Sequence, residues 1–226
     1  MTAPVPSLRR WLSGSSRSEP ERRHSASTKL QILFWGDYWD DMWRRKQQIA
    51  WGLSRLATVR HVVYVEQPLT LMSLLKTLVG RSGEARRRWR RLLQNRSLRF
   101  SVENVDVLTP ITLLPHMRWS PMWNLERSLR DWILRHLLRR DLPQSDVIWV
   151  GYPLVPLRLF EEQEGKKVFW YDCTEDFTAW DAIPLPVRED IRAVDAYLTR
   201  HAAVVSAVSR ILFDEKRKLN PRTYWL

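Results

Sequence analysis

The sequence predicts an α/β fold in which a parallel sheet of about six strands is flanked by helices. Short apolar runs alternate along the chain with segments of helical periodicity, which is the order of elements in βαβ units. Several of these runs carry apolar residues on both faces, as expected for strands that are covered on both sides. The chain has 226 residues, of which 44% are hydrophobic, so it can build a sizeable core.

The clearest βαβ unit lies near the start of the chain. Residues 30–35 form an apolar run that ends at a Gly-Asp pair, which predicts a buried strand entering a tight turn. Residues 40–57 predict a helix with apolar residues on one face and the polar residues 44–48 largely elsewhere. A second strand is expected at residues 61–65, and the crossover between the two strands should be right-handed.

The later elements are expected in the same alternating order. Residues 98–100 and 105–108 predict a strand pair or one interrupted strand. Further strands are expected at residues 146–150, 167–171 and 202–208, and further helices at 120–140, 155–164, 185–200 and 209–219. Residues 1–27 lack periodicity and predict a flexible basic tail, so the folded domain is expected over residues 28–226.

Composition narrows the possible partners. The net charge of +12 and a sequence pI near 10.4 favour an anionic partner such as nucleic acid, anionic lipid or a phosphorylated substrate. The single cysteine, Cys173, excludes a disulfide framework and a cysteine-based zinc site, and it fits a reducing cytoplasm. Thirteen tryptophans suit a core, a membrane interface or a sugar-stacking site equally well. No apolar run reaches the roughly 18 residues of a membrane-spanning helix.

Residues 69–94 combine a leucine-rich half with a basic half. Between residues 76 and 99 there are nine lysines and arginines and one acid. The basic cluster consists of Arg86, Arg87, Arg88, Trp89, Arg90 and Arg91. Leucines beside an arginine cluster with an embedded tryptophan are typical of a helix that lies on a membrane surface. The alternative is the solvated basic face of a surface helix.

Four acids follow the apolar run at residues 167–171 within ten residues: Asp172, Glu175, Asp176 and Asp181. In open parallel sheets ligands bind beyond the carboxyl ends of the strands, so this stretch is a candidate wall of a site. The alternative is that these acids cap a helix and solvate a loop.

Several common sites are absent from the sequence. There is no Gly-rich dinucleotide fingerprint, no phosphate-binding P-loop and no Gly-x-Ser-x-Gly motif. The five histidines have no metal-ligand spacing, and no Asp-x-Asp pair occurs. The basic residues form one leucine-rich segment and match no nucleic-acid reading motif, so nucleic-acid binding is the weakest of the alternatives.

Taken together, several stretches resemble the N-terminal half of a GT-B fold glycosyltransferase of the family-4 kind. The resemblance covers about residues 29–226. It includes a Tyr-Asp-x-x-Asp-Asp-Phe-like segment in which Glu175 replaces the first Asp of the pair. The matching stretches are residues 32–39 with Arg45 and Gln48, 63–68, 105–110 with Leu114 and Pro115, 149–153, 171–177 and 208–209.

The resemblance implies an activity and a location. Such enzymes transfer a sugar from a nucleotide-sugar donor to a glycan or lipid-linked acceptor, often in cell-surface polysaccharide synthesis, and generally without a bound metal or other cofactor. The N-terminal domain binds the acceptor, and many members are peripheral on the inner face of the plasma membrane. The basic cluster at residues 86–91 would then be the membrane-facing surface.

The resemblance also implies roles for individual residues. Gly36, followed by Asp37 and Trp39, matches the first loop, where backbone approaches the ligands. Asp172 matches the loop after the fifth strand, close to the reacting sugar, and is the expected catalytic residue. Glu175 and Asp176 are expected to be acceptor-orienting or structural acids. Tyr152 and Trp180 are expected to offer stacking faces, with ordinary packing as the alternative for each.

One departure from the family is large. The family's second domain carries a Glu-x₇-Glu pair that grips the donor, and no such pair exists in these residues. Because electrostatic stabilisation of the leaving group is usually the largest catalytic term, the chain alone is expected to have little or no transferase activity. Either it is a truncated or split gene product, or a separate partner chain supplies the donor domain. The alternative is a non-catalytic α/β domain that binds a membrane surface or a protein partner.

Overall fold

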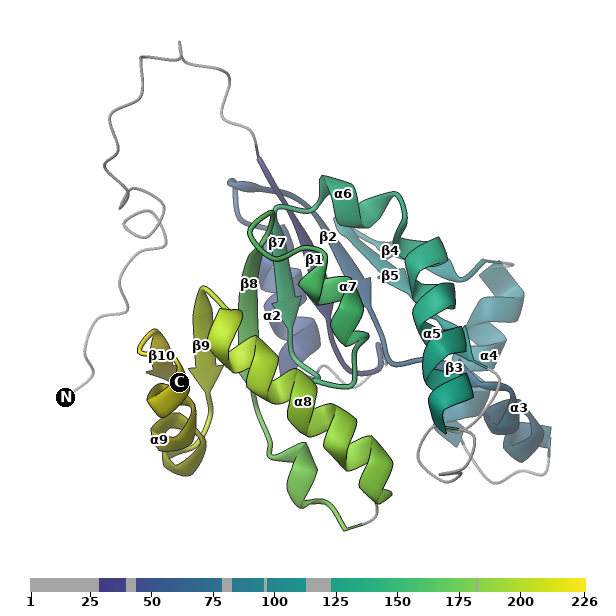
Figure 1. Cartoon of the computed structure of the whole chain (residues 1–226). Helices are drawn as coiled ribbons and strands as arrows, with labels where there is room; N and C mark the ends of the chain where they lie inside the picture. Colours follow the sequence, from purple (N-terminus) through teal and green to yellow (C-terminus); the bar gives the residue numbers. More distant parts are fainter. Residues whose placement is uncertain (1–28, 40–43, 79–82, 96, 113–122, 182) are drawn as a thin grey trace.

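An eight-stranded sheet lies at the centre of the molecule, in the order β10-β9-β8-β7-β1-β2-β5-β4 (Figure 1). The computed structural model describes residues 29–39, 44–78, 83–95, 97–112, 123–181 and 183–226, so the tail predicted for residues 1–27 lies outside the described residues. All neighbouring strands are parallel except β4 and β5. The strands are β1 (Leu30–Trp35), β2 (Val59–Val65), β4 (Arg99–Val102), β5 (Val105–Leu108), β7 (Val147–Val150), β8 (Val168–Cys173), β9 (Val204–Ala207) and β10 (Thr223–Trp225).

The predicted α/β class with a mainly parallel sheet is confirmed, but the expected count of about six strands is wrong. Of the two alternatives for residues 98–108, the strand pair is correct, because β4 and β5 form an antiparallel hairpin whose turn places Glu103 at a φ of 53°. The edge strand β4 is only half-buried, so its sequence lacks a continuous apolar run. The second additional strand, β10, has only three residues and pairs with β9.

Helices cover the two faces of the sheet unequally. One face packs against α2 (Arg45–Ser54), which lies behind the sheet in Figure 1. The other face packs against five helices: α5 (Trp123–Leu138), α6 (Asp141–Gln144), α7 (Leu157–Glu161), α8 (Leu185–His201) and α9 (Arg210–Leu219). This two-sided cover is the doubly wound arrangement that the alternating sequence pattern predicts.

Alternation along each strand divides the apolar side chains into two main cores. On the α2 face, the core includes Ile32, Phe34, Val62, Tyr64, Val107 and Trp149, with Trp170 partly buried against it. On the opposite face, it includes Leu33, Trp35, Val63, Val65, Ile148, Val150, Phe169, Tyr171 and Cys173. Most residues of β1 and β2 are therefore buried, which explains why those strands are largely apolar.

A smaller unit flanks the β2–β5 side of the sheet. It consists of α3 (Leu71–Leu78), α4 (Gly83–Asn95) and a two-stranded sheet of β3 (Leu69–Thr70) and β6 (Ile111–Thr112). Its own core contains Leu69, Ala85, Trp89 and Leu92. The leucine-rich and basic halves predicted within residues 69–94 are therefore two separate helices that pack on each other.

The strand order reverses at β1. From β1 the chain moves to β2 on one side, and it later returns to β7 on the other side of β1. In open α/β sheets such a reversal separates the loops that follow the two neighbouring strands, and ligands bind in the crevice between them. The fold thus places its expected binding site beyond the carboxyl ends of β1 and β7.

Cys173 is a direct reporter of this fold. Its side chain is buried beneath α8 and α9, and burial raises the pKa of its thiol to about 11, with Asp195 and Asp172 adding to the rise and Lys216 opposing it. At about pH 8 we expect alkylation by iodoacetamide to be on the order of 100-fold slower in the folded protein than in guanidinium, because the thiolate is the reactive form. Equal labelling rates, measured by mass spectrometry, would contradict this position of Cys173.

Candidate functional site at the carboxyl edge of the sheet

Two glycines follow the strands at the reversal point, and each is closely approached by a neighbouring side chain. The Gly36 N–H donates to the carbonyl of Val65, and the Gly151 N–H donates to the carbonyl of Trp35. A Cβ on Gly36 would lie 2.1 Å from the Tyr64 hydroxyl oxygen, and a Cβ on Gly151 would lie 3.0 Å from Cδ and Cε of Lys46. The structure thus provides a packing reason for glycine at both positions.

Lys46 connects the loops at this edge. It belongs to the first turn of α2, is only 4% exposed and places its ammonium 3.1 Å from a carboxylate oxygen of Asp37. The same ammonium lies 5.9 Å from the ring centres of Tyr152 and Phe177, within reach of a cation–π attraction. Asp37 retains partial exposure and also accepts a hydrogen bond from Gln67 at 3.4 Å. Lys46 was missed in the sequence because residues 44–48 have the composition of a solvated helix face.

Two aromatic residues with implied ligand roles are buried. Trp39 packs edge-on against Tyr64, and its backbone N–H donates to the carboxylate of Glu66 at 2.8 Å. Tyr152 packs edge-on against Phe177, and burial raises the pKa of its phenol, with Tyr38 and Asp37 adding to the rise. Both residues are therefore packed inside the protein at this edge of the sheet. Trp180, in contrast, is 46% exposed and keeps an aromatic surface toward solvent.

Asp172 lies within β8, which corrects the expectation that it belongs to the loop after that strand. Its carboxylate is enclosed and accepts three hydrogen bonds: two from Arg45, at 2.5 and 3.2 Å, and one from Ser206 at 2.7 Å. Asp172 therefore joins the start of α2 to β8 and β9. Its catalytic role stays a prediction. The geometry gives Asp172 a structural role, because its carboxylate connects these elements and its lone pairs are largely occupied by hydrogen bonds.

The other three acids of this stretch, Glu175, Asp176 and Asp181, are exposed. Asp176 accepts hydrogen bonds from the backbone N–H and the hydroxyl of Thr178, at 2.9 and 2.6 Å, and so caps the short 3₁₀ helix η2 (Phe177–Ala179). For Asp176 the capping alternative therefore describes the local geometry. Glu175 follows β8 with its side chain exposed, at the edge where ligands are expected.

A buried carboxylate, Glu66, organises the neighbouring part of the edge. It directly follows β2, is 0% exposed and bonds with Arg91 at 2.5 Å, with the hydroxyl of Thr109 and with the N–H of Trp39. Arg88 adds an ion pair at 3.5 Å. In the sequence Glu66 is only part of a weak motif, although an acid directly after an apolar strand and before a proline was the available signal.

The basic cluster of α4 is divided by these contacts. Arg88 and Trp89 are buried, and Arg91 lies partly buried above the ring of Phe100. Only Arg86, Arg87 and Arg90 are exposed. This corrects the prediction that all six residues form one membrane-facing surface. The helical periodicity directs half of these side chains toward Glu66 and the small core.

Known proteins give no further guide to the function. No protein-family model and no curated protein matches the chain. Within the described ranges, no group of three or more His, Cys, Asp and Glu side chains is arranged to hold a metal ion, and no helix has the length and apolar character needed to cross a membrane. The chemistry available at the edge is that of carboxylates, one enclosed ammonium and aromatic surfaces.

Proposed function

We propose that this chain is the acceptor-binding half of a glycosyltransferase that uses a nucleotide-sugar donor. The observation that carries the proposal is convergence: the loops after β1, β7 and β8, which contain three of the family-like stretches, are tied together by the contacts of Lys46. They lie at the reversal of strand order, where α/β folds bind ligands. Sequence resemblance and topology therefore indicate the same edge.

The available groups suit an acceptor that carries hydroxyls. Asp37 and Glu175 are carboxylates with exposed surface, and carboxylates accept hydrogen bonds from sugar hydroxyls. In the proposed reaction the acceptor oxygen forms a bond to the anomeric carbon, the bond from that carbon to the nucleotide diphosphate breaks, and a carboxylate takes the hydroxyl proton. A donor-binding half would stabilise the charge that develops on the diphosphate.

The proposal is tested by sugar transfer. The chain is combined with a polypeptide that carries a donor-binding domain with the Glu-x₇-Glu pair, and transfer from labelled nucleotide-sugars to a membrane glycolipid extract is measured. We expect transfer by the pair. The activity of Asp37→Asn should fall about 100-fold or more, since general-base and orienting carboxylates contribute about 10²–10⁴-fold. Asp214→Asn, on the exposed face of α9, is the matched control and should retain full activity.

Two outcomes would count against the proposal. One is the absence of transfer with every nucleotide-sugar and pairing. The other is full activity of Asp37→Asn. Asp172→Asn in the same assay separates the two acids: loss of transfer with unchanged thermal stability would support catalysis by Asp172, whereas a parallel loss of stability would reflect the contacts with Arg45 and Ser206.

A second candidate function is binding to an anionic membrane surface, without catalysis or in addition to it. The observation that favours it is the exposed side of α3 and α4, where Leu75 and Leu93 are 53% and 71% exposed. Arg86, Arg87 and Arg90 are exposed on α4, the helix that packs on α3. Exposed leucines beside arginines are typical of peripheral attachment, here to the inner face of the plasma membrane.

Vesicle binding tests this surface. We expect cosedimentation with phosphatidylglycerol vesicles that weakens as salt rises, and a loss on the order of 100-fold when Arg86, Arg87 and Arg90 are all changed to Gln, because each arginine near the surface contributes about 1 kcal/mol. The matched control changes the exposed residues Arg139, Arg140 and Arg200 to Gln. Equal binding by both triple variants would exclude α4 as the attachment site. Vesicle binding without transfer in any pairing would favour the non-catalytic alternative.

A further inference from the structure

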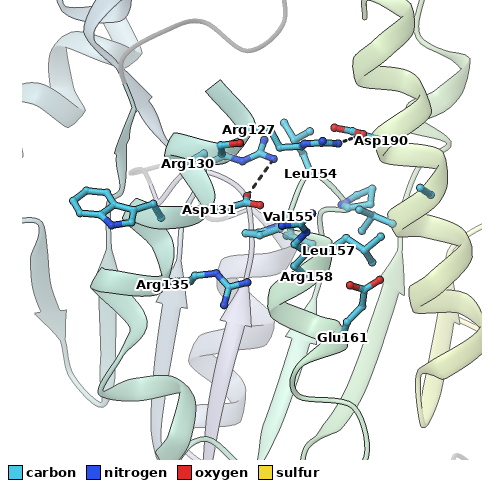
Figure 2. A pocket seen from close by; sticks show the side chains of 16 residues that line it. Arg127, Arg130, Asp131, Arg135, Leu154, Val155, Leu157, Arg158, Glu161 and Asp190 are labelled. Atoms are coloured by element: carbon cyan, nitrogen blue, oxygen red, sulfur yellow. Dashed lines mark hydrogen bonds and ion pairs between the residues drawn. The ribbon is translucent and has the colours of Figure 1, made fainter. Parts of the chain in front are cut away.

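A cavity of about 540 Å³ opens between α5, α7 and α8. Figure 2 shows its charged lining, with arginines of α5 on one side and Asp190 of α8 on the other. The volume falls within the roughly 300–1,000 Å³ of pockets that enclose small molecules. The lining includes none of the residues that contact Lys46 at the carboxyl edge. It begins at Pro153 of the loop after β7, so the cavity adjoins the site proposed above without sharing the contacts of Lys46.

The spacing of charged residues on α5 produces the lining. Arg127, Asp131 and Arg135 are each four residues apart, so they lie on the same face of the helix. Arg130 enters the cavity from the adjacent row, and Arg158 enters it from α7. Four guanidinium groups thus line one cavity together with the carboxylates of Asp131, Glu161 and Asp190.

Two of the arginines are held at the cavity by ion pairs. Arg127 donates to Asp190 at 2.9 Å, and Arg135 donates to Glu162 at 2.5 Å. In the described part of the chain, the guanidinium of Arg158 makes no hydrogen bond or ion pair within 4 Å, although it lies near enough to affect Asp131 electrostatically. Arg158 is therefore a donor at the cavity whose hydrogen bonds a ligand can take.

Asp131 lies among these arginines with unused bonding capacity. Its nearest charged atom is a guanidinium nitrogen of Arg130 at 3.9 Å, and its Oδ1 accepts no hydrogen bond from any described residue. Burial raises the pKa of Asp131, which shows that its charged form is poorly solvated. A hydroxyl group donating to Asp131 would supply the hydrogen bond that no described residue makes to its Oδ1.

We propose that this cavity binds a phosphorylated sugar. Arg158 and its neighbouring arginines would hold the phosphate, whose geometry matches the donor fork of a guanidinium, and Asp131 would accept from ring hydroxyls. Arginines alone would select any small anion, whereas Asp131 repels a bare phosphate and favours one that carries hydroxyls.

Calorimetric titration of the whole chain with glucose 1-phosphate, inorganic phosphate and glucose tests the proposal. We expect glucose 1-phosphate to bind at least about tenfold more tightly than inorganic phosphate, because a hydrogen bond to a charged group is worth about tenfold or more. Glucose, which lacks the phosphate, should not bind measurably. Arg158→Ala should weaken both anions by about tenfold or more. Asp131→Asn should remove only the advantage of the sugar phosphate.

The controls separate this site from the rest of the molecule. Arg139→Ala, at an exposed position next to the end of α5, should bind as the unchanged protein does, and Lys46→Met should also retain binding even if the proposed acceptor site is lost. Arg158 is exposed, so its removal should leave the core intact. A circular dichroism melt checks this. Absence of sugar phosphate binding, equal affinity for inorganic phosphate, or unchanged binding by Arg158→Ala would each overturn the proposal.

Discussion

Gly36→Ala is expected to destabilise the protein by about 3 kcal/mol or more, because the new methyl group would overlap a buried ring. The Cβ would lie 2.1 Å from the hydroxyl oxygen of Tyr64 and 2.4 Å from the ring carbon that bears it. Tyr64 cannot move aside easily, since it is 0% exposed and packs between Phe34 and Trp39. Urea denaturation followed by far-UV circular dichroism measures the change in the free energy of unfolding.

Gly52→Ala is the matched control for this substitution. Gly52 lies within α2 and has nothing within 4 Å of its hypothetical Cβ, so alanine should be neutral or stabilise by up to about 1 kcal/mol through helix propensity. A second variant isolates the overlap: Gly36→Ala combined with Tyr64→Ala should be far less destabilised than the two single changes predict. Additive effects in this cycle would contradict the close approach of Gly36 and Tyr64.

Glu66→Ala is expected to destabilise by about 3–5 kcal/mol, the range for breaking a buried ion pair from one side. The change would leave Arg88 buried without its carboxylate. It would also remove one of the acceptors of Arg91 and the acceptor of the Thr109 hydroxyl. Because both arginines belong to α4, we also expect faster amide hydrogen exchange across Gly83–Asn95 than across α8.

Glu103→Ala is the control for Glu66. Its carboxylate also pairs with an arginine, Arg55, at 3.3 Å, but both side chains are more than half exposed. An exposed pair contributes about 0–1 kcal/mol, so the free energy of unfolding should change little. If Glu66→Ala and Glu103→Ala had equal effects, Glu66 would not connect α4 to the sheet as described.

The fold was predictable to the extent that burial leaves a pattern in the sequence. Strands β1, β2, β7 and β8 are covered on both faces and appear as apolar runs, and α8 and α9 show helical periodicity within a residue or two of their observed bounds. The edge strands β4 and β10 left weaker signals, since an edge strand is half-exposed and short. The helix predicted at residues 40–57 is observed over Arg45–Ser54, and residues 40–43 lie outside the described residues.

The site was predictable in position and less so in composition. The structure places Gly36, Asp37 and Tyr152 at one edge of the sheet, and their role in ligand binding stays a prediction. Lys46 and Glu66 could not be identified, because a sequence pattern does not show that a charged side chain turns inward to meet a partner far along the chain. Burial of a charge depends on its partner, and that partner is defined only by the tertiary structure.

Hydrogen exchange with and without a lipid-linked glycan acceptor tests the central claim most directly, which is that acceptors bind at the reversal of strand order. The glycan is supplied in detergent as a polyprenyl-diphosphate-linked sugar, with empty detergent as the reference. We predict slower exchange at residues 36–39, 151–153 and 174–177, the loops after β1, β7 and β8. This protection should diminish in Asp37→Asn and persist in Asp214→Asn. Protection confined to other surfaces, with these three loops unchanged, would contradict the account.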